Sequence, residues 1–244
     1  MTVGSYRVSV DVATVWTTPD APRHGDAPAL ADEPDLAAWA RDLDRAAGLD
    51  LHGRTETQLL RGEPVEVVEE SPTGWVRVVA PWQPSPKNPR GYPGWVRRAH
   101  LTAATASSPY SSPPALIEAD PLVIAGFARG FLGRPYLWGG LSRFGLDCSG
   151  LVHLSYRQAG AVVPRDADAQ CAVAGPVELG QERPGDLYFF ARDDGLVFHV
   201  GIATGRLRML HAPEVGGVVE DAPLAAERRD TLVGAGRLLP SASP

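Results

Sequence analysis

The sequence predicts an α+β protein of two domains, in which a small antiparallel β-barrel precedes a domain of helices followed by an antiparallel sheet. Short alternating apolar runs between Gly and Pro turns occupy the first part of the chain. Helical periods and then strand-like runs fill the second part. Between the two parts, the small, polar, proline-rich stretch 103–114 resists packing and is typical of a linker.

The first domain is predicted from alternation of apolar and polar residues. Such alternation over 6–10, 65–69 and 75–79 is typical of strands in a small barrel. Between the first two runs a helical period appears and ends at Gly48, so we expect a helical insertion at about 33–48. The apolar face of that helix comprises Leu36, Trp39, Ala40 and Leu43.

Paired Gly-Trp turns mark the same domain. The segments 57–65, 74–78 and 94–96 together resemble a bacterial SH3-like domain, in which such turns lead into strands. This resemblance covers most of residues 5–102 and implies an SH3-like β-barrel with a helical insertion. The tryptophans would fill a barrel core under any other assignment as well.

Two helices and a run of short strands are predicted after the linker. We expect helices over 121–132 and 147–159. Strands follow in the segments GDLYFF, LVFHVGIAT, LRMLHA and GVVE. We therefore divide the chain into a first domain over 1–104, a linker over 105–116 and a second domain over 117–244.

Composition and charge narrow the class of protein. The 244 residues carry a formal charge of −6 and no long basic run, which argues against nucleic acid or an anionic membrane as a partner. No window approaches 18 consecutive apolar residues, and the first residues lack the pattern of a signal peptide. Cys148 and Cys171 are too few for a disulfide framework. We expect a cytoplasmic monomer, or a secreted protein if a leader has been removed.

Cys148 lies where a glycine-rich segment turns into a predicted helix. Asp147 or Ser149 is a plausible capping residue, so the thiol is expected at the helix N-terminus. Backbone N–H groups there stabilise a thiolate and also the oxyanion that forms on an attacked carbonyl. The position suits a nucleophile, although free cysteines are also common as inert packing, which is how we interpret Cys171.

A nucleophilic cysteine needs a base, and two histidines are candidates. His199 interrupts an apolar strand, where burying a titratable ring without a partner is costly. His211 follows on the expected neighbouring strand, so the rings could meet across the ladder as base and orienting group. Two core histidines are the alternative. We expect the other histidines to be structural (His153) or exposed (His24, His52 and His100).

Five motifs in order resemble those of the NlpC-type cell-wall peptidases. They are RPYLWGG at 134–140, DCSG at 147–150, PRD at 164–166, RPGDL at 183–187 and FHVGI at 198–202. The resemblance covers roughly 117–238. It implies a papain-like cysteine peptidase that cuts γ-D-glutamyl-diamino acid bonds in peptidoglycan peptides.

Residue by residue, the resemblance implies a catalytic set. Cys148 would be the nucleophile, His199 the base and His211 the group that orients the base. Tyr136, from the first motif, would hydrogen-bond near the thiolate, although it could equally be a half-buried aromatic.

The same resemblance implies contacts to the substrate. Asp147 and Ser149 would receive polar groups of the substrate, although both could act only as helix caps. Arg165 and Asp166 would lie beside the cleft, and Arg suits the free α-carboxylate of D-glutamate. A weak surface ion pair is the alternative. Ala167 replaces a serine of some relatives, so one hydroxyl contact is expected to be missing.

An SH3-like domain fused ahead of such a catalytic domain is similar to members that recycle murein peptides. There the first domain closes one end of the cleft and holds the free amine of L-alanine. Glu56 and Tyr92 occupy the matching positions, where a carboxylate and a phenol suit an ammonium. Glu56 could otherwise be only a charged residue at a strand edge.

The predicted reaction is hydrolysis of the γ-D-glutamyl-L-diamino acid bond in murein peptides with a free N-terminal L-Ala, releasing L-Ala-D-Glu. No metal or organic cofactor is expected, because the histidines and cysteines show no ligand spacing. The alternatives are a secreted endopeptidase or autolysin anchored to the wall by its SH3-like domain, a peptide-binding protein without activity, and acyl transfer or amide hydrolysis on another substrate.

Overall fold

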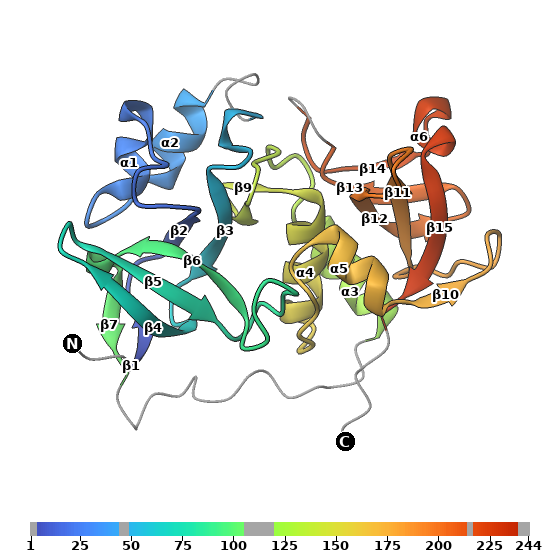
Figure 1. Cartoon of the computed structure of the whole chain (residues 1–244). Helices are drawn as coiled ribbons and strands as arrows, with labels where there is room; N and C mark the ends of the chain where they lie inside the picture. Colours follow the sequence, from blue (N-terminus) through green and yellow to red (C-terminus); the bar gives the residue numbers. More distant parts are fainter. Residues whose placement is uncertain (1–3, 44–48, 105–119, 214–216, 239–244) are drawn as a thin grey trace. The chain divides into compact units, whose positions relative to one another are not determined.

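The computed structural model describes residues 4–43, 49–104, 120–213 and 217–238. By its contacts the chain forms two compact units (Figure 1). Unit 1 comprises Met1–Pro113 with Leu137–Leu146, and unit 2 comprises Pro114–Tyr136 with Asp147–Pro244. The predicted linker at 105–116 lies outside the described residues. No helix in the described ranges is both long enough and apolar enough to cross a membrane.

Unit 1 is built on an antiparallel sheet, which among the described residues has seven strands in the order β3-β2-β6-β5-β4-β1-β7. The strands are β1 (Gly4–Val8), β2 (Val12–Trp16), β3 (Thr55–Leu60), β4 (Pro64–Ser71), β5 (Trp75–Ala80), β6 (Tyr92–Arg97) and β7 (Leu101–Ala103). This order has two ends, so the sheet does not close on itself, and the predicted SH3-like β-barrel stays a prediction. Strands β3 and β7 are the two edges of the sheet and do not pair with each other. Strand β3 contacts β8 (Leu141–Ser142).

Short helices cover one side of this sheet. They are η1 (His24–Asp26), α1 (Ala27–Leu30), α2 (Leu36–Asp42), η2 (Leu49–Leu51) and η3 (Arg98–His100). Helix α2 lies within the predicted insertion, begins at a cap in which Asp35 accepts from the Ala38 N–H at 2.8 Å, and buries Trp39. Residues 44–48 of the insertion lie outside the described residues.

His100 differs from its prediction as a surface histidine, because it is only 1% exposed. Its Nε2 lies 2.8 Å from the carbonyl oxygen of Ala31, the hydrogen-bond acceptor that this interior position offers. Burial lowers the pKa of the ring, which keeps it neutral.

The segment Leu137–Leu146 belongs to unit 1, although the sequence division placed it in the second domain. It folds as a hairpin of β8 and β9 (Gly145–Leu146), and Leu141 donates its N–H to the Gln58 side chain at 3.0 Å. Gly139 has φ +73°, and a Cβ there would meet Thr55 Oγ1 at 3.1 Å. The chain therefore passes through unit 1 and re-enters unit 2 at Asp147.

Unit 2 contains a second antiparallel sheet, and in its described part six strands run in the order β10-β15-β11-β12-β13-β14. They are β10 (Gly175–Val177), β11 (Leu187–Ala191), β12 (Val197–Gly205), β13 (Arg208–His211), β14 (Glu220–Pro223) and β15 (Leu232–Arg237). Strand β14 begins later than the predicted GVVE strand, and the glycine-rich β15 was not predicted. Phe189 and the rest of β11 are buried at the centre of this sheet.

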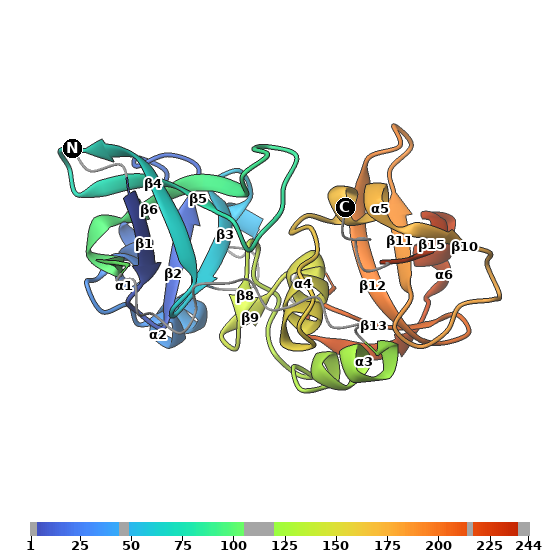
Figure 2. The same ribbon diagram turned by 90° about the horizontal axis from the view of Figure 1, so that it is seen from below.

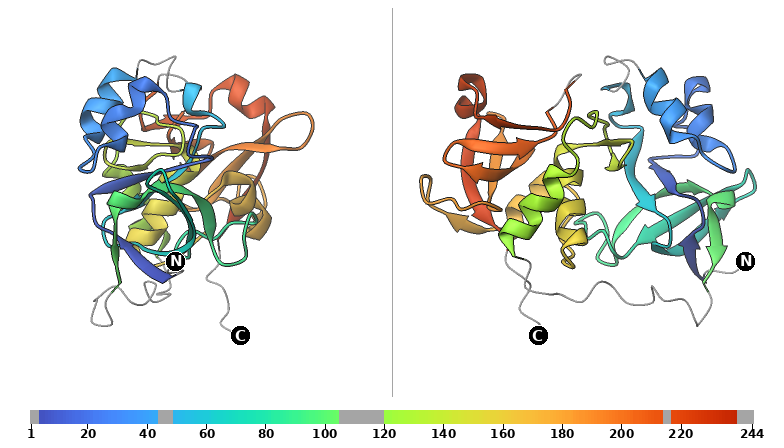
Figure 3. Two further views of the ribbon diagram at one scale, coloured as in Figure 1. Left: turned by 60° about the vertical axis from the view of Figure 1, so that its left-hand side comes forward. Right: turned by 180° about the vertical axis from the view of Figure 1, so that it is seen from behind.

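Unit 2 has four helices among the described residues (Figure 2), of which α3 and α4 were predicted and α5 and α6 were not. They are α3 (Pro121–Arg129), α4 (Cys148–Gln158), α5 (Ala167–Val173) and the short α6 (Ala226–Asp230). Helices α4 and α5 contact β12, and α3 lies beside α4, as the view from behind shows (Figure 3). The predicted combination of helices and antiparallel strands is thus confirmed.

An ion pair between the buried Asp186 and the partly exposed Arg237 joins the start of β11 to β15. Asp186, which is 1% exposed and precedes β11, accepts from Arg237 Nε at 2.6 Å and Nη2 at 2.8 Å. The same carboxylate accepts the Arg183 N–H at 2.8 Å, which closes the turn of the RPGDL motif. This one side chain therefore fixes both the turn and the partner strand.

We expect Asp186→Asn to lower the free energy of unfolding by about 1–3 kcal/mol, because Arg237 loses its charged partner. Chemical denaturation measures the change. Arg77→Gln, which breaks an exposed ion pair with Glu69, is the control and should change stability by less than about 0.5 kcal/mol. Equal effects of both variants would contradict the role of Asp186.

Candidate active site

Cys148 is the first residue of α4, as the sequence predicted. The N-cap is Asp147, whose extended backbone (φ −88°, ψ 176°) turns the chain into the helix, and its Oδ1 accepts the Gly150 N–H at 2.6 Å. The thiol belongs to a residue that is 6% exposed. It lies where the N–H groups and the dipole of the first turn favour negative charge.

Arg165 is buried beside this helix start, with 1% of its surface exposed. It donates from Nη1 to Asp147 Oδ1 at 2.9 Å and from Nη2 to Asp147 Oδ2 at 2.7 Å. A further hydrogen bond joins Nη1 to Ser149 Oγ at 3.0 Å. The guanidinium thus compensates the charge of Asp147 directly next to Cys148.

This geometry bears on the predicted substrate contacts. Arg165 was expected to bind a substrate carboxylate, but both terminal nitrogens bind Asp147 and Ser149 inside the protein. Its side chain is buried, so Arg165 is not the surface arginine that the alternative supposed. Gln170 adds to the same cluster by donating to the carbonyl of Ser149 at 3.0 Å. Asp166 is the N-cap residue of α5 and is partly exposed.

The two predicted histidines meet on neighbouring strands. His199 on β12 and His211 on β13 join Nε2 to Nδ1 at 2.9 Å, and their rings stand edge to face. Both are buried, at 0% and 5% exposure. Helix α4, which begins at Cys148, packs against β12, the strand that carries His199.

Glu220 favours one set of tautomers in this pair. Its Oε1 lies 3.3 Å from His211 Nε2, and a carboxylate can only accept, so the Nε2 of neutral His211 carries the proton. The Nδ1 of His211 then accepts from His199 Nε2–H. His199 Nδ1 is left with a lone pair; it is buried and has no hydrogen-bond partner among the described residues. The unprotonated Nδ1 of His199 can therefore accept a proton, as a general base must.

The surroundings keep both rings neutral. Burial is the main cause that lowers the pKa of His199 well below 6.5, with the positive charge of Arg228 as the next. The same two causes lower the pKa of His211 to about 4. Arg228 on α6 lies 5.6 Å from the centre of the Phe190 ring, and that ring is 5.6 Å from the ring of His199.

The remaining predicted residues lie in two places. Tyr136 is partly buried, and its N–H donates to the Gly217 carbonyl at 2.9 Å in unit 2. Glu56 and Tyr92 meet in unit 1, where the Tyr92 hydroxyl donates to Glu56 Oε2 at 3.3 Å. Both are held in strands, since Glu56 lies in β3 and Tyr92 begins β6.

Sequence analysis missed three residues around the histidines and the cysteine. Glu220 and Arg228 follow no motif, because their contacts depend on how β14 and α6 pack against the pair. Gln170 lies on α5, five residues after Arg165, a separation that does not place two side chains on one helix face, so the sequence carried no signal for it. His153 is fully buried, as predicted for a structural residue, with Nδ1 at 2.8 Å from the Val163 carbonyl.

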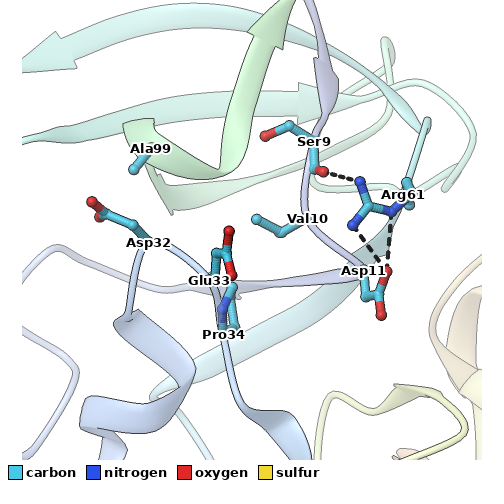
Figure 4. A pocket seen from close by; sticks show the side chains of 8 residues that line it. All are labelled: Ser9, Val10, Asp11, Asp32, Glu33, Pro34, Arg61 and Ala99. Atoms are coloured by element: carbon cyan, nitrogen blue, oxygen red, sulfur yellow. Dashed lines mark hydrogen bonds and ion pairs between the residues drawn. The ribbon is translucent and has the colours of Figure 1, made fainter.

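Unit 1 also contains a cavity of about 460 Å³ (Figure 4). Asp11, Asp32 and Glu33 contribute carboxylates to its lining, and Arg61 donates to Asp11 and to the carbonyl of Ser9. None of the predicted site residues lines it. Within the described residues, no cluster of three or more His, Cys, Asp and Glu side chains is placed to hold a metal ion.

Comparisons with known proteins agree with the motifs. The sequence model described as the NlpC/P60 family matches residues 133–237. The chain is 32% identical to a gamma-D-glutamyl-L-lysine dipeptidyl-peptidase of Bacillus subtilis, over 86% of this chain and 90% of the relative. A protein of the same name from Bacillus cereus is 30% identical over 96% of this chain and 90% of the relative.

A solved structure is similar over nearly the whole chain. The crystal structure of an NlpC/P60 family protein from Bacillus cereus has a TM-score of 0.90 at 28% identity, covering 97% of this chain and 100% of that one. The resemblance to the NlpC-type peptidases is thereby confirmed. The SH3-like assignment of the first domain stays a prediction.

We expect His211→Leu to slow alkylation of Cys148 by iodoacetamide roughly tenfold near neutral pH, because His199 loses the partner that orients it. His211→Asn keeps an acceptor and should retain more of the rate. Mass spectrometry of the Cys148 peptide separates this reaction from that of Cys171. Equal alkylation rates in wild type and His211→Leu would contradict an orienting role.

Burial of neutral histidines also predicts a stability loss in acid. Burial lowers the pKa of His153 from 6.5 to about 3, so between these values the unfolded chain binds more protons than the folded one. The free energy of unfolding should therefore fall as pH decreases from 6.5. His153→Gln should make this slope shallower by about 1.4 kcal/mol per pH unit in denaturation experiments. His52→Gln, at an exposed ring, is the control, and an unchanged slope in His153→Gln would contradict the prediction.

Proposed function

The chain belongs to the NlpC/P60 family of cysteine peptidases, and from this membership we propose that it hydrolyses the γ-D-glutamyl-diamino acid bond of murein peptides. The observation that carries the proposal is the histidine pair, in which His199 Nε2 is held by His211 while its buried Nδ1 has no partner among the described residues. The names of the two relatives specify L-lysine as the diamino acid.

Hydrolysis would proceed in two steps through a thioester. In the first, His199 Nδ1 takes the proton of Cys148, and the sulfur attacks the γ-carbonyl of D-glutamate. First-turn N–H groups of α4 stabilise the oxyanion. His199 then returns the proton to the leaving amine of the diamino acid. In the second step His199 takes a proton from water, which attacks the thioester and restores the thiol.

The low pKa of His199 suits this sequence. A neutral imidazole in the resting protein is ready to accept a proton, and burial together with Arg228 disfavours the imidazolium. Attack and proton transfer are then coupled. The pairing of Asp147 with Arg165 prevents an uncompensated carboxylate from opposing negative charge on the neighbouring sulfur.

Asp147 and Ser149 flank the nucleophile, and we propose that they contact the substrate together with Tyr136 and Asp166. Arg165 would act through them as a positioning residue. Its buried guanidinium holds the Asp147 carboxylate and the Ser149 hydroxyl in place. Arg165 is engaged with Asp147 and Ser149, and Ala167 has no hydroxyl. The α-carboxylate of the substrate's D-glutamate would then be bound by Ser149 or by main-chain groups.

Recognition of a free N-terminus is the finer part of the proposal. A dipeptidyl-peptidase releases a dipeptide from the amino end, so it needs a group that binds the ammonium. Glu56 and Tyr92 of unit 1, which we propose to be an SH3-like domain, supply a carboxylate and a phenol in contact with each other. Glu56 follows Thr55, which contacts Trp138 in the segment that leads to Cys148.

The experiment compares two substrates by mass spectrometry. We expect purified protein to release L-Ala-D-Glu from L-Ala-γ-D-Glu-L-Lys or its meso-diaminopimelate analogue, and to leave intact peptidoglycan uncut. That outcome would support the recycling of released peptides, a role for which we propose a cytoplasmic monomer. Cleavage of the polymer would instead support a secreted endopeptidase, with unit 1 as its anchor.

Two controls test the chemistry. Cys148→Ala should abolish turnover without changing the circular dichroism spectrum, and substantial residual hydrolysis would remove the cysteine mechanism. N-acetylation of the substrate's alanine should weaken cleavage at least roughly tenfold, because an acetylated amine cannot pair with Glu56. Equal cleavage of both peptides would remove the amine site.

A further inference from the structure

The ammonium of Lys87 already lies on both residues of the amine site. Lys87 Nζ donates to Glu56 Oε2 and, at 2.9 Å, to the Tyr92 hydroxyl. It also lies 4.7 Å from the centre of the Tyr92 ring, within the range of a cation–π contact. All three residues belong to unit 1.

Glu56 and Tyr92 are held in strands, whereas the Lys87 side chain extends from a turn and is more exposed to water. Glu56 lies in β3, and Tyr92 is 2% exposed at the start of β6, opposite Ala80 of β5. Lys87 lies in the turn region before β6, and its side chain is 43% exposed against 21% for that of Glu56. The Lys87 ammonium can therefore move into water without crossing the protein interior.

A lysine side chain and a peptide N-terminus present the same chemical group. Each ends in an ammonium with three N–H donors, and one carboxylate oxygen and one phenol cannot hold two ammonium groups in the same place. We propose that Lys87 is an internal competitor for the amine site, which a substrate's N-terminal ammonium must displace. This inference rests on the proposed function, because it takes Glu56 and Tyr92 as the ligands of that ammonium.

The exchange has two consequences. Displacement replaces one ion pair with another, so the charge at the site is unchanged and peptide binding should depend little on salt. The tether also gives Lys87 a high effective concentration at the site, so only a peptide that gains further contacts elsewhere displaces it. Lys87 would thus select against simple amines and keep Glu56 paired between turnovers.

The test measures binding to protein that cannot turn over. Isothermal titration calorimetry with L-Ala-γ-D-Glu-L-Lys compares Cys148→Ala with the double variant Cys148→Ala, Lys87→Met. Removing the competitor should lower the Kd by roughly threefold to tenfold, the range of a partly exposed ion pair with a cation–π contact. Binding to the double variant should also weaken more steeply with added salt.

Two controls isolate the amine. Arg90→Gln, in the same region, removes a cation that pairs with Glu66 rather than with Glu56, and it should leave the Kd unchanged. The peptide acetylated on its alanine should bind both proteins equally, because it has no N-terminal ammonium to compete with Lys87.

The outcomes separate this inference from the proposed function. If Lys87→Met leaves the Kd unchanged or raises it, Lys87 is not a competitor. If Glu56→Gln still weakens binding in that case, the proposed amine site stands without the competition. A higher Kd would make Lys87 a ligand of the substrate. If Glu56→Gln has no effect on binding, or if the peptide does not bind, the amine site itself fails and the inference fails with it.

Discussion

The ion pair between Asp147 and Arg165 is the interaction on which the candidate site depends. A buried carboxylate must be paired, because the low-dielectric interior does not solvate its charge. Arg165 pairs it through both terminal nitrogens. Asp147 is thereby able to cap α4 next to Cys148, at the position where the chain re-enters unit 2 from unit 1. One pair thus sets the helix start, the place of the thiol and the local charge.

The histidines show how a chain of contacts can determine a protonation state. A carboxylate accepts only, so Glu220 assigns the proton on His211, and His211 in turn assigns the proton on His199. Burial and Arg228 then hold both rings neutral. The Nδ1 of His199 is thereby left able to accept a proton, a state that depends on residues of β13 and β14 as well as on His199.

Unit 1 contributes a different kind of chemistry. Glu56 and Tyr92 form an acceptor pair for a cation, and Lys87 supplies one from within the protein. The strand that carries Glu56 also contacts the segment 137–146, which runs directly to the N-cap of the nucleophile. The proposed amine site and the segment that leads to Cys148 are therefore linked through one stretch of backbone.

The sequence by itself determined the elements and the catalytic candidates. Helical period and capping placed Cys148 at the start of α4, and alternation with strand order placed His199 and His211 on adjacent strands. Only the tertiary structure decided that Arg165 pairs with Asp147, that Lys87 reaches Glu56 and Tyr92, that the first sheet stays open and that 137–146 folds with unit 1. Local pattern encodes period and caps over a few residues, whereas these pairings join side chains far apart along the chain and depend on how whole elements pack.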